Sequence, residues 1–188
     1  MLYRSHSAVD RAARPRGSPT GRRYDRAHDH WVSVDSTYRT ALDDLLAERG
    51  MEATSDVRAE LNSAWKRLDP WPDAVPGLTR LRRRYTLATL SNADVDAVVS
   101  ITRHCDFPWH AVFTAEMAGA HKPDPRTYRM AAHYLGVQPG EIMMVASHKY
   151  DIRAAAALGF RTAFVARPLE FGDPAVTDFE DLAGQLGC

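Results

Sequence analysis

The spacing of apolar residues predicts helices in the first ordered part of the chain. Apolar side chains recur at intervals of three and four residues over 37–49 and again over 55–68, which is the period of an amphipathic helix. Ser36 is expected to cap the first helix and Gly50 to end it. A proline-rich stretch, 69–72, then ends the second helix. The side chains expected to be buried are Leu42, Leu45, Leu46, Val57, Leu61, Ala64 and Trp65.

The pattern changes after residue 75, where short and almost continuous apolar runs alternate with helical periods. The runs predict strands over 85–90, 111–114, 141–146 and 161–166, and the segments around them predict helices over 76–84, 94–104, 126–135 and 150–158. Strands that are apolar on both faces and alternate with helices form parallel sheets covered on both sides. We therefore predict an α/β fold with a doubly wound parallel sheet, in which ligands bind beyond the carboxyl ends of the strands.

The first thirty residues show neither the helical nor the strand pattern of apolar residues. Seven arginines stand between Met1 and Arg26 against Asp10 and Asp25, and prolines and glycines are mixed among them. Such a composition predicts a disordered leader; a transit peptide, a nucleic-acid-binding arm and a segment outside the native coding sequence stay open as alternatives. The predicted organisation is an Arg-rich leader over 1–30, a partial helical cap over 31–70 and an α/β core over 71–188.

Charge and cysteine content narrow the range of partners. The 24 basic and 24 acidic residues balance, so we expect no nucleic-acid and no membrane partner for the chain as a whole. No apolar run approaches the roughly 18–20 residues that cross a bilayer. Cys105 and Cys188 are too few for a disulfide framework, which predicts a reducing, cytoplasmic location.

Polar residues follow three of the predicted strands at the point where each strand ends. Ser91 and Asn92 follow the first strand, Lys122 lies after the second in His-Lys-Pro-Asp-Pro, and Asp151 lies after the third. Each has an ordinary structural explanation: the Ser-Asn pair can cap a helix, the lysine can be solvated, and a carboxylate is favoured in a first helical turn. Because all of them follow successive strands of one sheet, we expect them to converge on one crevice.

The order of these motifs resembles that of the haloacid dehalogenase-like hydrolases. The segments 68–78, 90–92, 122–128 and 167–172 are similar to the type II L-2-haloacid dehalogenases, and the resemblance covers about 31–172. The fold that it implies is the Rossmann-like core of that superfamily with a partial helical cap. The activity that it implies is SN2 displacement of halide by an aspartate carboxylate, after which water hydrolyses the ester.

The resemblance also implies a role for each candidate residue. Ser91 and Asn92 would bind the substrate carboxylate, and Tyr128 would donate a hydrogen bond at the mouth of the site. Lys122 would keep the attacking carboxylate ionised, and Asp151 would pair with Lys122 and orient the hydrolytic water. The implied partner is a small 2-haloacid or a similar carboxylate, with a possible homodimer, and the implied reaction needs no metal and no cofactor.

The stretch before Asp151 departs from two branches of the superfamily. Ser147 stands where the magnesium-dependent phosphatases carry a carboxylate, so the stretch is a poor magnesium site and favours a dehalogenase over a phosphatase. Ala146 and His148 stand where the best-studied dehalogenases have a serine and an asparagine. Ser147 and His148 are therefore candidate supporting residues, and the departure puts efficient turnover of 2-haloacids in doubt.

The nucleophile that the resemblance requires is not found. An apolar strand that ends in Asp-x-x-Gly-Thr should open the chain, and neither Asp10 nor Asp25 lies in such a segment. We therefore expect a truncated or frameshifted form of a dehalogenase-like chain that is inactive by itself. A noncatalytic binding module and a phosphatase are the alternatives. Because the missing strand is central, the strand ending at Leu90 and the strand ending at Ala146 are expected to pair directly or to expose their edges for self-association.

Overall fold

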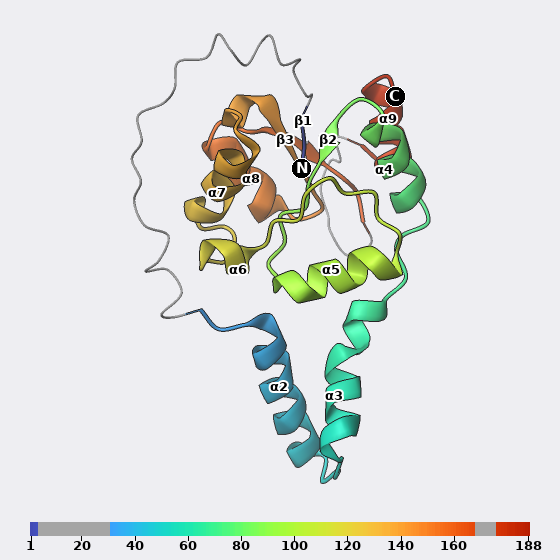
Figure 1. Ribbon diagram of the computed structural model, residues 1–188, viewed down its shortest axis with the longest axis vertical. Helices are drawn as coiled ribbons and strands as arrows, with labels where there is room; N and C mark the ends of the chain where they lie inside the picture. The colour runs from blue at the N-terminus through green and yellow to red at the C-terminus, as the bar shows by residue number, and fades with distance from the viewer. Residues whose placement is uncertain (4–30, 168–175) are drawn as a thin grey trace.

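A computed structural model describes residues 1–3, 31–167 and 176–188. The predicted α/β class is confirmed: α7 and α8 lie on one side of a central sheet, and α4 and α9 lie on the other (Figure 1). The core helices are α4 (Ala74–Arg82), α5 (Val95–His104), α6 (Ala115–Ala118), α7 (Pro125–Leu135), α8 (Lys149–Ala157) and α9 (Phe179–Gln185). The strands are β1 (Leu2–Tyr3), β2 (Thr86–Leu87), β3 (Ile142–Ala146) and β4 (Arg161–Phe164).

The sheet has the order β2-β1-β3-β4, and its topology corrects the prediction for the centre. β3 and β4 pair in parallel, as expected, but β1 lies between β2 and β3 and pairs antiparallel with both. Leu2 is opposite Leu87 on one side and opposite Met143 on the other. The expectation that the flanking strands pair directly is therefore wrong, because the first residues of the chain supply the backbone groups that these strands need. The rest of the predicted leader, 4–30, lies outside the described residues.

The predicted strand 111–114 forms isolated parallel bridges instead of a named strand. Ala111 is bridged to Ala88, and Thr114 is bridged to Ser91. This segment therefore extends the pairing beyond β2 on the side away from β1.

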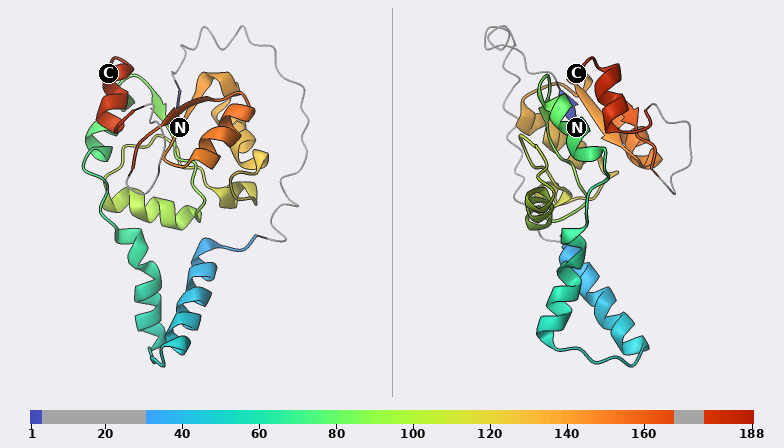
Figure 2. Two further views of the ribbon diagram at one scale, coloured as in Figure 1. Left: turned by 180° about the vertical axis from the view of Figure 1, so that it is seen from behind. Right: turned by 90° about the vertical axis from the view of Figure 1, so that its right-hand side faces the viewer.

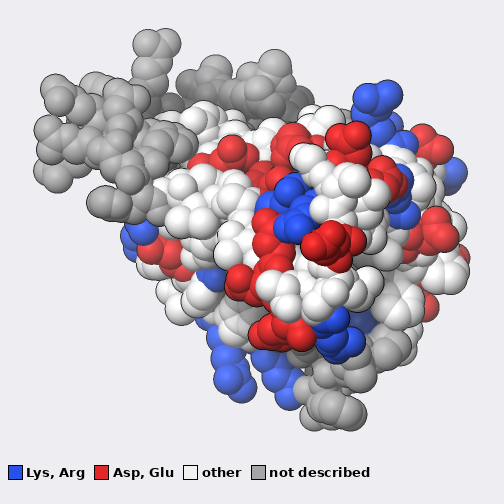
Figure 3. All heavy atoms as spheres, turned by 90° about the horizontal axis from the view of Figure 1, so that it is seen from below, with Lys and Arg blue, Asp and Glu red and all other residues white. Residues whose placement is uncertain are grey.

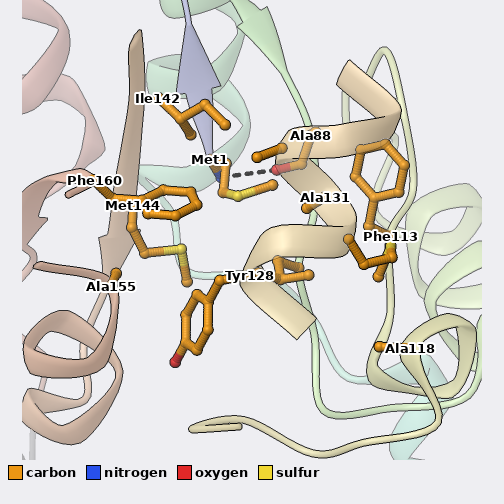
Figure 4. Close-up of a cluster of buried hydrophobic side chains, with 13 residues drawn as sticks. Met1, Ala88, Phe113, Ala118, Tyr128, Ala131, Ile142, Met144, Ala155 and Phe160 are labelled. Atoms are coloured by element: carbon orange, nitrogen blue, oxygen red, sulfur yellow. Dashed lines mark hydrogen bonds between the residues drawn. The ribbon is translucent and has the colours of Figure 1, made fainter. Parts of the chain in front are cut away.

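Met1, just before β1, and Leu2 each contribute a side chain to a different face of the sheet, because successive residues of an extended segment point to opposite sides. Met1 belongs to the apolar cluster that contains Tyr128 and Met130 of α7 (Figure 4). Leu2 belongs to the cluster on the other face. Met1 is 8% exposed and Leu2 is 4% exposed. Burial of side chains of this size contributes about 1.5–3 kcal/mol each, so the short strand packs into both cores as well as pairing with two neighbours.

The α-amino group of Met1 is buried at the end of β1. Its nitrogen donates a hydrogen bond to the carbonyl oxygen of Ala88 at 2.8 Å, and the Ala88 N–H donates to the Met1 carbonyl at 2.9 Å. Burial, reinforced by the nearby charge of Lys122, lowers the pKa of this amino group from 8.0 to about 5. The folded chain therefore holds a neutral amine at neutral pH.

A two-helix hairpin, α2 (Val34–Glu48) and α3 (Ser55–Ser63), projects away from the sheet (Figures 1 and 2). Ser33, not Ser36, caps α2, since its side chain accepts from the Ser36 N–H. The α2 N-terminus is also held by Asp94, whose two carboxylate oxygens accept from the backbone N–H groups of residues 34 and 35 at 3.1 and 2.8 Å. The hairpin therefore joins the core through a buried carboxylate.

Several side chains that the helical period predicts to be buried are exposed on the hairpin. Leu45, Val57 and Leu61 are 47%, 48% and 49% exposed, whereas Leu46 is buried as predicted. The prediction fails for them because the described part of the chain contains no layer that covers this face of the hairpin. Seen from below, the hairpin carries acidic and basic side chains intermixed, with no continuous basic patch on that face (Figure 3). Within the described residues no helix is long and apolar enough to cross a membrane.

The C-terminal helix α9, which the apolar pattern did not predict, packs closely against α4. A Cβ atom added to Gly77 would lie 2.5 Å from both the carbonyl carbon and the Cβ of Phe179. Asp73, just before α4, accepts hydrogen bonds from Arg167 at 2.8 Å and from the Phe179 N–H at 2.9 Å. Together these contacts close the face of the sheet that Leu2 covers.

We predict that Gly77→Ala destabilises the fold, whereas Gly184→Ala does not. The new methyl group at Gly77 meets backbone atoms of α9 that cannot move aside independently, which costs about 1–3 kcal/mol. Gly184 lies in α9 with no atom within 4 Å of an added Cβ, so alanine there gains up to about 1 kcal/mol of helix propensity. Urea unfolding of both variants measures the difference. Equal stabilities would show that the α4–α9 contact is looser than described.

We also predict that the buried amine makes stability depend on pH. The folded-state pKa is lowered, so between about pH 8 and pH 5 the unfolded chain binds a proton that the folded chain does not. The free energy of unfolding should therefore fall as pH falls through this window, by on the order of 4 kcal/mol, and level off below it. Urea unfolding across the window should show this slope. In a chain acetylated at Met1, the amide N–H still donates a hydrogen bond but does not titrate, so the pH dependence due to the amino group should be absent. Identical pH profiles for the two chains would contradict the burial of the amino group.

Candidate functional site

A pocket of about 400 Å³ opens at the carboxyl ends of the strands. Two strand-end segments, 88–92 and 144–148, form its opposite walls, and Met1 lies between them. The structure brings Ser91, Asn92, Lys122, Asp151, Ser147 and His148 together in its lining. Of the residues proposed from the sequence, Tyr128 does not line this pocket.

Lys122 and Asp151 form a buried ion pair at the base of the pocket. The Lys122 ammonium contacts Oδ2 of Asp151, and the two side chains are 9% and 2% exposed. Asp151 lies in the first turn of α8, so the strand–loop–helix arrangement after β3 aims its carboxylate back at the loop that carries Lys122. The pair therefore joins two of the three strand ends.

Tyr128 completes this cluster from beneath. Its hydroxyl donates to Oδ1 of Asp151 at 2.6 Å, and the residue is fully buried on α7, with its ring edge-on to Phe160. Burial, together with the hydrogen bond to Asp151, raises the pKa of the Tyr128 hydroxyl above its ordinary range. The expected position at the mouth is wrong, because the residue lies on the core-facing side of α7. The geometry makes Tyr128 a support for Asp151, and contact with substrate does not follow from it.

Asn92 holds the lysine loop. Its Oδ1 accepts from the Lys122 N–H at 2.7 Å, and its Nδ2 donates to the Lys122 carbonyl at 3.1 Å. Both ends of the amide are therefore engaged with the backbone of Lys122, which is a positioning contact that the sequence did not indicate. The backbone N–H of Ser91 donates to the Phe113 carbonyl, and its carbonyl accepts from the Ala115 N–H. These two bonds fix the backbone from which the Ser91 side chain extends.

The stretch after β3 supplies the outer wall of the pocket. Ser147 is half-buried, and His148 is exposed at the N-cap of α8, where its ring stacks on Tyr150 with centroids 5.6 Å apart. Trp109 also lines the pocket. Sequence reasoning missed it because Trp109 precedes the segment 111–114 and so does not follow a predicted strand. Met1 also lines the pocket, and sequence reasoning missed it because a two-residue strand has no detectable periodicity.

The pocket lining offers a small anion one cation and several polar side chains. It offers few groups that could act as a nucleophile toward carbon. Among the described residues that line the pocket, Asp151 is the one carboxylate, and both of its oxygens are engaged by Lys122 and Tyr128. Asp10 and Asp25 lie outside the described residues. Over the described ranges no group of three or more His, Cys, Asp or Glu side chains is placed to hold a metal ion.

Comparison with known proteins finds relatives that are named as haloacid dehalogenases. A family model described as haloacid dehalogenase-like hydrolase matches residues 7–159. The (S)-2-haloacid dehalogenase 4A of Burkholderia cepacia is 30% identical over 161 residues, which cover 84% of this chain and 67% of that protein. The (S)-2-haloacid dehalogenase of Xanthobacter autotrophicus is 32% identical over 131 residues, covering 69% of this chain and 51% of its own length. The chain thus spans about half to two thirds of these relatives.

Solved structures agree with the sequence relatives. The L-2-haloacid dehalogenase PA0810 superposes with a TM-score of 0.79 at 36% identity, covering 87% of this chain and 78% of that one. The Xanthobacter autotrophicus L-2-haloacid dehalogenase with chloropropionic acid covalently bound superposes with a TM-score of 0.72 at 25% identity, covering 83% of this chain and 76% of that one. On the shared fold, the family model and these identities, the chain belongs to the haloacid dehalogenase-like hydrolases.

Proposed function

We propose that the pocket binds a short 2-haloalkanoic acid, or a similar carboxylate, as part of a 2-haloacid dehalogenase-like hydrolase. The observation that carries the proposal is the buried Lys122–Asp151 pair, backed by Tyr128 and held by Asn92 at the strand ends. The relatives support it, because they are haloacid dehalogenases and one of them holds chloropropionic acid covalently. No cofactor is part of the proposal.

The roles follow from charge and position. Lys122 supplies the positive charge that attracts a carboxylate, and because its side chain is largely buried, an ion pair with it is worth more than in water. Ser91 offers a hydroxyl from the wall that also holds the Lys122 loop through Asn92. Asp151, held by Lys122 and Tyr128, would accept a further hydrogen bond from the hydrolytic water and so orient it.

A displacement of halide also needs a nucleophile, and the described lining does not offer a free carboxylate. Attack by an aspartate would form a carbon–oxygen ester bond and release halide, and attack of water on that ester would return the carboxylate. We therefore propose that this chain binds the acid but does not release halide by itself. A noncatalytic binding module is the alternative that this same observation favours.

We predict that the chain binds propionate and does not release chloride from (S)-2-chloropropionate, with or without magnesium. Calorimetry should detect propionate, and Lys122→Met should weaken its binding at least tenfold, because the cation is lost while the apolar stem is kept. Arg126→Met, an exposed cation nearby on α7, is the matched control and should bind as the parent does.

Three results would contradict this function. Chloride release that Lys122→Met leaves unchanged would place the chemistry elsewhere in the chain. Release that requires magnesium would favour the phosphatase-like branch instead. Propionate binding that both lysine and arginine variants share equally would show that the pocket is not the acid site.

We predict that breaking the buried pair on one side costs far more stability than removing both charges. Lys122→Met leaves the Asp151 carboxylate buried without its cation, which costs about 3–5 kcal/mol. Adding Asp151→Asn removes that charge while its amide oxygen still accepts from Tyr128, so the double variant should recover most of the loss. Arg126→Met should leave the free energy of unfolding nearly unchanged, because that ion pair is exposed. Additive losses in urea unfolding would mean that the two residues are not coupled.

The homodimer, the cytoplasmic location and the boundary of the helical cap at residue 70 stay predictions. The hairpin exposes large apolar side chains on both of its helices, which is consistent with self-association through it. Sedimentation velocity of the purified chain would measure its oligomeric state directly.

A further inference from the structure

The edge of β2 that faces away from β1 is closed by a histidine. Leu87 pairs with Leu2 of β1 on one side, and on its other side its carbonyl accepts from the backbone N–H groups of His110 and Ala111 at 2.9 and 3.4 Å. The Leu87 N–H donates to Nδ1 of the His110 ring at 3.1 Å. The ring therefore takes the place that a backbone carbonyl has in a strand pair, and it satisfies a donor of a fully buried residue.

This contact requires a neutral imidazole. A neutral ring has one N–H and one acceptor nitrogen, whereas a protonated ring donates from both nitrogens. Because Nδ1 of His110 accepts from Leu87, the proton of the neutral ring lies on Nε2. Protonation would place a second ring N–H against the Leu87 N–H, so this hydrogen bond is lost in the charged form.

The charged group beside the ring opposes its protonation. Nε of Arg82, at the end of α4, lies 3.2 Å from Nε2 of His110. β2 contributes a backbone amide to the ring and no charge, and Asp106, the nearest carboxylate along the chain, lies by Cys105 instead. Burial, and then the charge of Arg82, lower the pKa of His110 below its ordinary value of 6.5.

His110 is also the chain neighbour of a residue in the wall of the pocket. Trp109 lines the pocket, and its ring packs against that of Phe107 with centroids 5.6 Å apart. Its backbone N–H donates to the Phe107 carbonyl at 3.0 Å on one side, and on the other side the chain is attached to Leu87 through His110. The position of Trp109 therefore depends on the bonds that His110 makes with β2.

We propose that His110 is a pH-sensitive positioning residue for the pocket. In its neutral form it closes the edge of β2 and holds Trp109 in the pocket wall, and in its protonated form it releases both. His110 is exposed, so protons from solvent reach its ring in the folded chain. Ligand binding should therefore be strongest at neutral pH and weaken as His110 takes up a proton below pH 6.5. The effect on binding rests on the proposed function, whereas the effect on β2 does not.

Proton NMR of the full chain measures the titration directly. The Cε1–H resonance of His110, assigned as the one that His110→Asn lacks, should titrate with a midpoint below 6.5. Arg82→Met should raise the midpoint by about 0.5 unit, because the adjacent charge is lost. Arg83→Met, at the next residue of the same helix end, is the matched control and should leave the midpoint unchanged. A midpoint at or above 6.5, or equal shifts in the two variants, would overturn the proposal.

Hydrogen exchange of the Leu87 amide tests the contact with β2. His110→Asn is the matched variant, because Oδ1 of asparagine is attached to Cγ as Nδ1 is and accepts a hydrogen bond without titrating. The protection factor of the Leu87 amide should fall at least tenfold from about pH 7 to about pH 5 in the parent and stay constant in His110→Asn. In Arg82→Met, which keeps the histidine, the fall should occur at higher pH. The same fall in the parent and in His110→Asn would show that another group, such as the Met1 amine, controls this edge, and the proposal would be wrong.

Propionate binding separates this role from the proposed function. The dissociation constant measured by calorimetry should rise at least threefold from about pH 7 to about pH 5.5 in the parent and less in His110→Asn, since the titration of propionate itself is the same for both chains. Equal rises would show that His110 does not position the pocket wall. Absence of propionate binding at both pH values would overturn the proposed function, and exchange of the Leu87 amide would still decide the role of His110 at β2.

Discussion

The structure depends on backbone pairing at the centre of its sheet. β2 and β3 are not hydrogen-bonded to each other, and the two residues of β1 connect them by pairing with both. Leu2 of β1 packs in the core on one face, and Met1, just before it, packs in the core on the other. Buried strand groups without partners are costly, so a very short segment joins two halves that otherwise share no strand contact.

The geometry of the candidate site follows from the position of β1 between β2 and β3. Ser91 and Asn92 come from the β2 side, and Asp151 comes from the β3 side. Lys122 reaches across to Asp151 while Asn92 holds its backbone, so the ion pair and the amide together join the two halves at the strand ends. The polar cluster and the β1 pairing therefore reinforce one another on either side of the pocket.

Local sequence determined much of this protein. Runs of apolar residues between helical periods indicate the α/β class, and polar residues just after those runs indicate which side chains meet, because the carboxyl ends of parallel strands share one edge. Ser91, Lys122 and Asp151 line one pocket for that reason. Gly136, with φ of 67° directly after α7, ends its helix for an equally local reason, since glycine adopts this conformation without strain.

The place of β1, the role of Tyr128 and the exposure of the hairpin were decided only by the tertiary structure, because each depends on contacts between residues far apart in the sequence. Nothing in Met1, Leu2 and Tyr3 marks a strand, and their antiparallel place is set by partners more than eighty positions away. Tyr128 belongs to a helical period that does not say whether its hydroxyl meets substrate or Asp151. Val57 and Leu61 have the spacing of buried residues yet lie half exposed. The spacing shows that a helix has an apolar face, but it does not show whether another element packs against that face.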